Sequence, residues 1–178
     1  IFEHIWNRDF IDNIQISFAE SIGVEDRGGY YDHSGALKDM IQNHALQVLS
    51  ILAMDKPASF READVRAEKI KVFQNLKQQT DEEIKRNFVR AQYSEGRIDG
   101  QHYIGYLDET NIAANSQTET FAGGVFFVDT DRFRDVPFFF RTGKRLTEKG
   151  TRVTITFKKA EDIFGQRSEQ NILTIYIQ

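Results

Sequence analysis

The sequence predicts an α+β fold, with a largely antiparallel sheet and helices packed on one face. One strand pattern comes first, helical patterns follow to about residue 87, and strand patterns occupy most of the remainder. Strands and helices segregated in this way are typical of α+β domains. A doubly wound nucleotide-binding fold would alternate strands with helices and carry a glycine-rich loop after its first strand, and neither feature occurs here. We therefore interpret residues 1–178 as a single domain.

The first predicted strand covers Ile11 to Phe18. Apolar side chains alternate with polar ones in its second half, at Ile14, Ile16 and Phe18. This period of two indicates a strand with one buried face. A loop rich in glycine follows, from Ala19 to Tyr31.

A long helix is expected after this loop. Ser34 is a candidate N-cap for a helix that begins near Gly35, and Pro57 cannot continue it. Residues at helical spacing form one predicted stripe, made of Leu37, Ile41, His44, Val48 and Ile51. His44 is thus expected on an otherwise apolar, buried face.

The remaining elements complete the predicted order. Ser59 is expected to cap a second helix over about residues 60–77, and Thr80 with Glu83 forms a capping box for a third helix through about Asn87. Gly123 and Gly124 indicate a bulge or close packing inside a strand. The later strand patterns are short pieces within 88–108, then 118–128, 136–142, 152–158 and 172–178.

Composition excludes several classes of function. Cysteine is absent, which excludes disulfides, thiolate metal sites and a cysteine nucleophile, and suits a cytoplasmic protein. The net charge is −4 and no apolar run approaches the roughly 20 residues that span a bilayer, so we expect neither nucleic-acid nor membrane partners. The other histidines lack metal-ligand spacing, so no metal site is expected. The chain starts without Met and has no signal-peptide pattern, so we expect it to be part of a longer protein.

Two residues of the long helix are candidates for chemistry. A neutral imidazole at His44 could accept a proton from a hydroxyl, although a core histidine with a hydrogen-bond partner fits the pattern too. Asp39 could orient substrate hydroxyls, or it could be a solvated acid in the first helical turn. In an α-helix the two lie about 140° apart around the axis, so direct contact between them is not expected.

A cation cluster follows the strand near residue 140. Lys144 and Lys149 lie on a glycine-containing turn that suits a phosphate ester, with Arg141 or Arg145 as helpers. An ordinary basic turn is the alternative. Glu20 lies just past the first strand, a common place for a binding residue.

Two segments carry a family resemblance. GGYYDHSGALKDMIQNHALQVLSILAMDKP and VPFFFRTGKRLTEKG closely resemble the C-terminal domain of the glucose-6-phosphate dehydrogenase family, in its bacterial form. IFEHIWNRDFIDNIQISFAES and NILTIYIQ fit as well, so the resemblance covers essentially the whole chain. It implies that residues 1–178 are a single, incomplete substrate-binding and dimerisation domain. The family oxidises D-glucose 6-phosphate to the lactone and passes hydride to NADP, or in some bacteria to NAD.

The resemblance also implies roles for individual residues. By resemblance, His44 is expected to be the general base of the family. The expected ligands of the sugar or its phosphate are Glu20, Asp39, Lys144, Lys149 and Gln178. NADP is expected mainly on a coenzyme domain outside this chain, and the segment Arg-Ile-Asp-His-Tyr-Leu-Gly-Lys that completes the substrate site is also outside it. We therefore expect no dehydrogenase activity from these 178 residues alone.

The resemblance also bears on assembly and on a second nucleotide. A second, structural NADP is not expected, because Gly150, Thr154 and Tyr176 stand where its cations would be. The family pairs through the broad sheet of this domain, so a homodimer or homotetramer is expected. A subunit-contact module without its own ligand binding is the alternative function, and an unrelated sugar-phosphate binder is a third.

Overall fold

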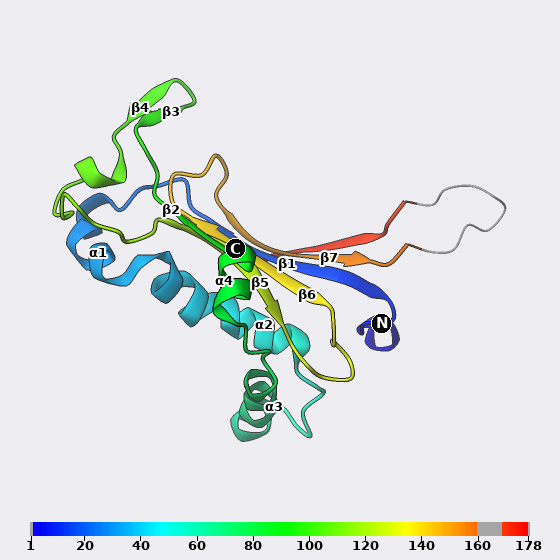
Figure 1. Ribbon diagram of the computed structural model, residues 1–178. Coiled ribbons are helices and arrows are strands. Elements are labelled where there is room, and N and C mark those ends of the chain that lie inside the picture. The colour runs from blue at the N-terminus through cyan, green and yellow to red at the C-terminus, as the bar shows by residue number, and fades with distance from the viewer. Residues whose placement is uncertain (1, 160–168, 178) are drawn as a thin grey trace.

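The computed structural model describes residues 2–159 and 169–177 and has a six-stranded sheet at its centre (Figure 1). Its strand order is β2-β5-β6-β1-β7-β8. The strands are β1 (Ile11–Ala19), β2 (Phe88–Ala91), β5 (Phe121–Phe127), β6 (Pro137–Gly143), β7 (Gly150–Phe157) and β8 (Ile172–Ile177). A separate hairpin contains β3 (Gly96–Ile98) and β4 (Gln101–Tyr103). The predicted largely antiparallel sheet is confirmed.

One pair of neighbouring strands is parallel. β1 and β6 run side by side from Ile14 opposite Phe138 to Ala19 opposite Gly143. Every other pairing in the sheet is antiparallel. The carboxyl ends of β1 and β6 therefore meet at one edge of the sheet, and the residues that follow them begin the candidate site.

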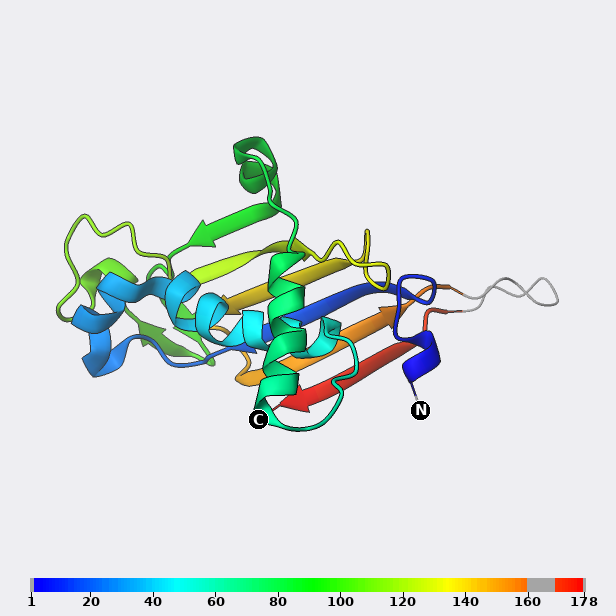
Figure 2. The ribbon, with the colours of Figure 1, turned by 90° about the horizontal axis from the view of Figure 1, so that it is seen from below.

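Most helices form a layer on one face of the sheet, as predicted, whereas the short helix that precedes β2 lies beside this edge strand (Figures 1 and 2). In chain order they are α1 (Gly28–Ala36), the π-helix η3 (Leu37–Ala45), α2 (Leu46–Ala53), α3 (Glu62–Gln74) and α4 (Asp81–Asn87). Short 3-10 turns occur at η1 (Glu3–Ile5), η2 (Glu25–Arg27) and η4 (Tyr106–Asp108).

The main core lies between this helical layer and the sheet. The alternating side chains of β1 contribute Ile14, Ile16 and Phe18, confirming the first predicted strand. The helices contribute a stripe at i, i+4 spacing, made of Ile41, Ala45, Leu49 and Ala53. Large apolar side chains such as Ile41 and Leu49 each contribute roughly 1.5–3 kcal/mol when buried, so the stripe fixes the helical layer on the sheet.

The helix predicted to begin near Gly35 is confirmed, but a shorter helix from Gly28 precedes it, and Gly35, with φ 68° and ψ 171°, separates the two. Two other helical predictions need correction. Ser34 does not cap the helix start, where the Ala36 and Leu37 amides donate to Glu119 instead. α3 is shorter than the predicted second helix, and Arg61 rather than Ser59 precedes its first residue. The Ser59 hydroxyl instead donates to Asp64 and accepts from the Arg61 amide. The Thr80–Glu83 capping box is confirmed.

Close packing, rather than a bulge, explains the glycine pair in β5. The register of β5 against β6 is continuous through both residues. A Cβ atom added at Gly124 would lie 2.6 Å from Cδ1 of Phe88, so only glycine fits beneath that ring. Phe88 packs there against Phe126 and Phe140, at ring-centroid distances of 5.7 Å to each.

Candidate functional site

The site begins where β1 and β6 end together. The Glu20 amide donates to the Gly143 carbonyl at 3.0 Å, which extends the parallel pairing by one residue. Beyond it, Lys144 Nζ donates to Glu20 Oε2 at 2.8 Å. The Lys144 side chain is only 11% exposed, so the acid holds a largely buried ammonium group at the edge of the sheet. Partial burial makes such a charged hydrogen bond stronger than a surface ion pair.

Tyr31 of α1 lies beside the Glu20–Lys144 pair. The Lys144 ammonium lies 5.1 Å from the centroid of the Tyr31 ring, within cation–π range. Burial raises the pKa of Tyr31 well above its ordinary value, and the nearby negative charges of Asp39, Glu20 and Glu119 raise it further. Tyr31 therefore stays neutral, and three carboxylates from separate parts of the chain lie close enough to act on one phenol.

His44 lies over the end of β1, but not in the buried stripe. Its ring centroid is 6.4 Å from that of Phe18, two residues before Glu20. The side chain is exposed, whereas its neighbour Ala45 is buried. The expectation of a histidine on the apolar face is therefore wrong, and an exposed imidazole is free to meet a ligand.

The π-helix explains this error, and it also changes the angle expected between Asp39 and His44. The Leu46 amide donates to the Ile41 carbonyl, a bond that spans five residues. In such a helix, residues five apart stack on nearly the same side. Asp39 and His44 are five apart and both lie within η3, so they face the same side rather than being about 140° apart as in an α-helix.

Gly35 and Glu119 hold the start of the π-helix. The Leu37 amide donates to Glu119 Oε1 at 2.9 Å, and the Ala36 amide donates to the Glu119 carbonyl at 3.0 Å. The Glu119 residue is only 7% exposed. A Cβ atom at position 35 would lie 2.5 Å from Glu119 Oε1, so glycine is needed there for contact as well as for its backbone angles.

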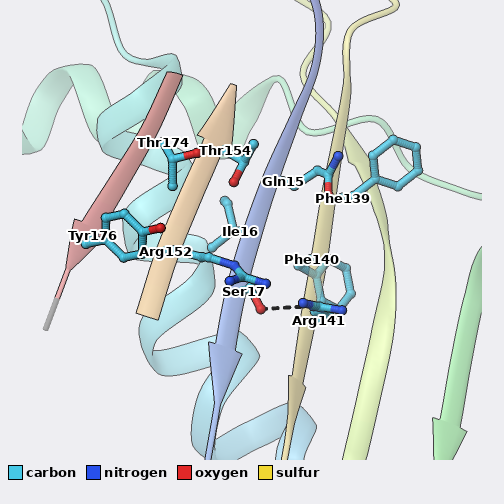
Figure 3. Close-up of a pocket in the computed structure, with 10 residues that line it drawn as sticks. All are labelled: Gln15, Ile16, Ser17, Phe139, Phe140, Arg141, Arg152, Thr154, Thr174 and Tyr176. Carbon is cyan, nitrogen blue, oxygen red and sulfur yellow. Dashed lines mark hydrogen bonds between the residues drawn. The ribbon is translucent and has the colours of Figure 1, made fainter. Parts of the chain in front are cut away.

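Lys149 lies apart from this group. It is exposed and lines a hollow on the sheet face opposite the helices, together with Arg141, Arg152 and Tyr176. Figure 3 shows the adjoining hollow on that face, where Arg141 Nε donates to Ser17 Oγ at 3.0 Å. Among the described residues, no hydrogen bond or ion pair joins Lys149 to Glu20 or Lys144. Gln178 lies outside the described residues.

The described residues contain neither a membrane-spanning helix nor a cluster of metal ligands. Between residues 2–159 and 169–177, no helix combines the length and apolar character needed to cross a membrane. Across the same ranges, no three His, Cys, Asp or Glu side chains gather closely enough to hold a metal ion.

The family model described as glucose-6-phosphate dehydrogenase, C-terminal domain, matches residues 1–178. The chain belongs to the glucose-6-phosphate dehydrogenase family. It is 67% identical over 178 residues to glucose-6-phosphate 1-dehydrogenase of Streptococcus pneumoniae. This match covers 100% of this chain and 36% of that protein. The Bacillus subtilis enzyme is 44% identical over 185 residues, with 100% and 37% covered.

Solved structures give the same result. A glucose-6-phosphate dehydrogenase in complex with its substrate glucose-6-phosphate superposes with a TM-score of 0.88 at 34% identity, covering 98% of this chain and 35% of that one. The glucose-6-phosphate 1-dehydrogenase from Mycobacterium avium gives a TM-score of 0.83 at 33% identity, covering 98% and 37%. The chain thus spans little more than a third of the length of these relatives.

Within this glucose-6-phosphate dehydrogenase domain, the structure gathers four of the predicted site residues around one sheet edge. They are Glu20, Asp39, His44 and Lys144. Sequence reasoning missed Tyr31 and Glu119, although both lie in the immediate surroundings. No local pattern pointed to Glu119, whereas the glycine at position 35, where a helix was expected to start, hinted at a special backbone contact.

Proposed function

We propose that this chain provides the substrate side of a glucose-6-phosphate 1-dehydrogenase that oxidises D-glucose 6-phosphate to 6-phosphogluconolactone, as in the pentose phosphate pathway. The observation that carries the proposal is the meeting of Glu20, Lys144, Asp39 and His44 at the carboxyl ends of β1 and β6. A buried ammonium suits an anionic ligand, carboxylates suit sugar hydroxyls, and an exposed imidazole suits a proton acceptor.

In this proposal the imidazole of His44 takes the proton of the C1 hydroxyl as C1 loses a hydride. The C1–H and O–H bonds break, the C1=O bond of the lactone forms, and the hydride is passed to NADP or NAD. Glu20 and Asp39 orient the sugar hydroxyls, while Lys144 contacts the sugar or its phosphate. Lys149 lines a hollow on the other face of the sheet, so the proposal gives it no contact with this group. Binding energy from the phosphate, remote from the reacting bond, then positions C1.

We assign the nicotinamide cofactor to the rest of the protein. A dinucleotide site needs a βαβ unit with a glycine-rich turn at a helix N-terminus. Here β1 and β6 are parallel, but along the chain more than a hundred residues and several other strands lie between them. The loop after β1 reads ESIGVEDRGG, which is not that glycine-rich turn. Reduction of NADP by the isolated 178-residue chain would contradict this assignment.

The test of the proposed base is His44→Ala in the full-length protein. Loss of a general base should lower kcat about 10²–10⁴-fold with little change in KM for glucose 6-phosphate. His33→Ala is the matched control, because His33 is an exposed histidine of α1. A change in kcat no larger than the control's would remove His44 from this role.

The second candidate function is subunit contact, as a dimer or tetramer, through the sheet face opposite the helices. Phe139 of β6 and Tyr176 of β8 are exposed on that face. In the strand register Phe139 lies opposite Gln15, and Tyr176 lies opposite Arg152. Exposed aromatic side chains on an uncovered sheet favour a protein interface. Sedimentation of the full-length protein carrying Phe139→Asp should then show a smaller assembly, and an unchanged sedimentation coefficient would reject the face as the contact.

A further inference from the structure

Arg145 occupies the junction between the two strand ends that form the site. Its amide donates to the Ile22 carbonyl at 3.1 Å, and the next amide, from Leu146, donates to the Glu20 carbonyl at 2.9 Å. The turn that carries Lys144 is thus tied by its backbone to the loop that carries Glu20. Arg145 achieves this at φ 55°, in the left-handed region that residues with a side chain rarely adopt.

The Arg145 side chain makes a second tie, to two acidic residues. Its Nη2 lies 3.3 Å from Glu25 Oε1, just past the Glu20 loop, and 3.5 Å from Glu109 Oε1, after η4. The guanidinium carbon lies 4.3 Å from the centroid of the Tyr103 ring of β4. At 13% exposure, this side chain is buried among partners from three separate segments.

The loop is shaped to admit the guanidinium. A Cβ atom at Gly23 would lie 2.7 Å from both Nε and Nη2 of Arg145, so the absence of a side chain there makes room for it. Glu109 is held in turn by the Tyr93 hydroxyl, which donates to its Oε1 at 2.8 Å. The guanidinium therefore links the Glu20 loop to the β3–β4 hairpin region.

The backbone conformation and the burial of Arg145 both cost folding free energy. A non-glycine residue in the left-handed region is strained, and among the described residues Arg145 Nε is buried without a hydrogen-bond partner. Strained and incompletely satisfied residues that persist next to a site are candidates for a positioning role.

We propose that Arg145 is a positioning residue that holds the Lys144 ammonium and the Glu20 carboxylate in the geometry that binds substrate. It acts through the turn and the loop and does not touch the substrate itself. The inference rests on the proposed function of the Glu20–Lys144 pair. A displaced Lys144–Glu20 pair would bind substrate less tightly, so Arg145 can influence KM although it lies behind the residues that contact the substrate.

The test is Arg145→Met in the full-length enzyme, which keeps the length of the side chain and removes its charge. We expect KM for glucose 6-phosphate to rise about tenfold, as for the loss of one charged hydrogen bond, with kcat changing less than about threefold. Arg145→Lys should recover part of the loss. Arg134→Met is the matched control, because Arg134 is an exposed arginine that pairs with Asp129 and Asp131 in the β5–β6 connection.

Gly23→Ala gives an independent perturbation if Arg145→Met folds poorly. The added methyl group should push the guanidinium away without removing any charge, so KM should again rise while kcat is retained. Unchanged KM in both variants, with folding intact by circular dichroism, would overturn the inference. If KM rises in Lys144→Met but not in these variants, only the role of Arg145 fails; if Lys144→Met leaves KM unchanged, the proposed function of the pair fails instead.

Discussion

Replacing Gly35 with alanine should loosen the whole helical segment that carries Asp39 and His44. Gly35 has φ 68° and ψ 171°, a combination open almost only to glycine, and adopting it costs other residues about 1–3 kcal/mol. The new Cβ atom would also lie 2.5 Å from Glu119 Oε1, which must then withdraw from the Leu37 amide. A hydrogen bond to a charged group is worth about 1.5–3 kcal/mol. Together these effects amount to about 2.5–6 kcal/mol.

Hydrogen–deuterium exchange of residues 28–53 in the full-length protein measures this change directly. Each 1.4 kcal/mol corresponds to a factor of ten, so exchange in this segment should accelerate at least about 50-fold. Gly100→Ala is the matched control: Gly100 also has positive φ, at 81°, but a Cβ atom added there would have no other atom within 4 Å. Its effect should be confined to the β3–β4 turn.

A double-mutant cycle separates the two contributions. Glu119→Ala alone removes the hydrogen bond to Leu37, and the double variant cannot lose it twice. The two single effects should therefore sum to about 1.5–3 kcal/mol more than the effect of the double variant. Strict additivity, or exchange in Gly35→Ala within about twofold of the unmodified protein, would refute the cap formed by Glu119.

Three further predictions concern stability, each measured by urea unfolding of the full-length protein. Gly124→Ala should destabilise by about 1–3 kcal/mol, since its Cβ atom would collide with Phe88, and a neutral result would contradict the close packing. Thr80→Ala should cost about 1 kcal/mol through loss of the capping box, and Thr80→Ser should restore most of it. Burial of Asp32 raises its pKa, but hydrogen bonds from Ser116, Tyr106 and the Ala113 amide outweigh burial and hold the pKa below its ordinary value. Its stabilisation is therefore present above the unfolded pKa and lost as pH falls through the folded one, so Asp32→Asn should reduce the acid sensitivity of stability; unchanged acid sensitivity would exclude this linkage.

Local patterns predicted most element types correctly. Alternation from Ile14 to Phe18 marked β1, the Thr80–Glu83 pair marked the start of α4, and the later apolar runs marked β5 to β8. These features depend on residues that are close in sequence, where side-chain direction and backbone capping follow simple periods.

The same reasoning failed where the helix period changed. An α-helical spacing placed His44 with Ile41 and Val48, but the π-helix shifts the buried stripe to Ala45 and leaves His44 exposed. A π-helix is rare and persists where surrounding contacts support it, so no propensity scale predicts it from the residues alone. Here the support at its start comes from Glu119, which is 82 residues away from Leu37.

The amino-acid sequence by itself determined the fold class, the order of elements and the membership in a family, because repeated local patterns and specific motifs survive without coordinates. Only the tertiary structure decided which side chains meet. Glu20 and Lys144, separated by 124 residues, come into contact because β1 and β6 pair in parallel and end together, while Lys149, five residues later, lies elsewhere. Such meetings depend on strand register and on the direction in which the chain returns, and both are settled by long-range packing rather than by neighbours along the chain.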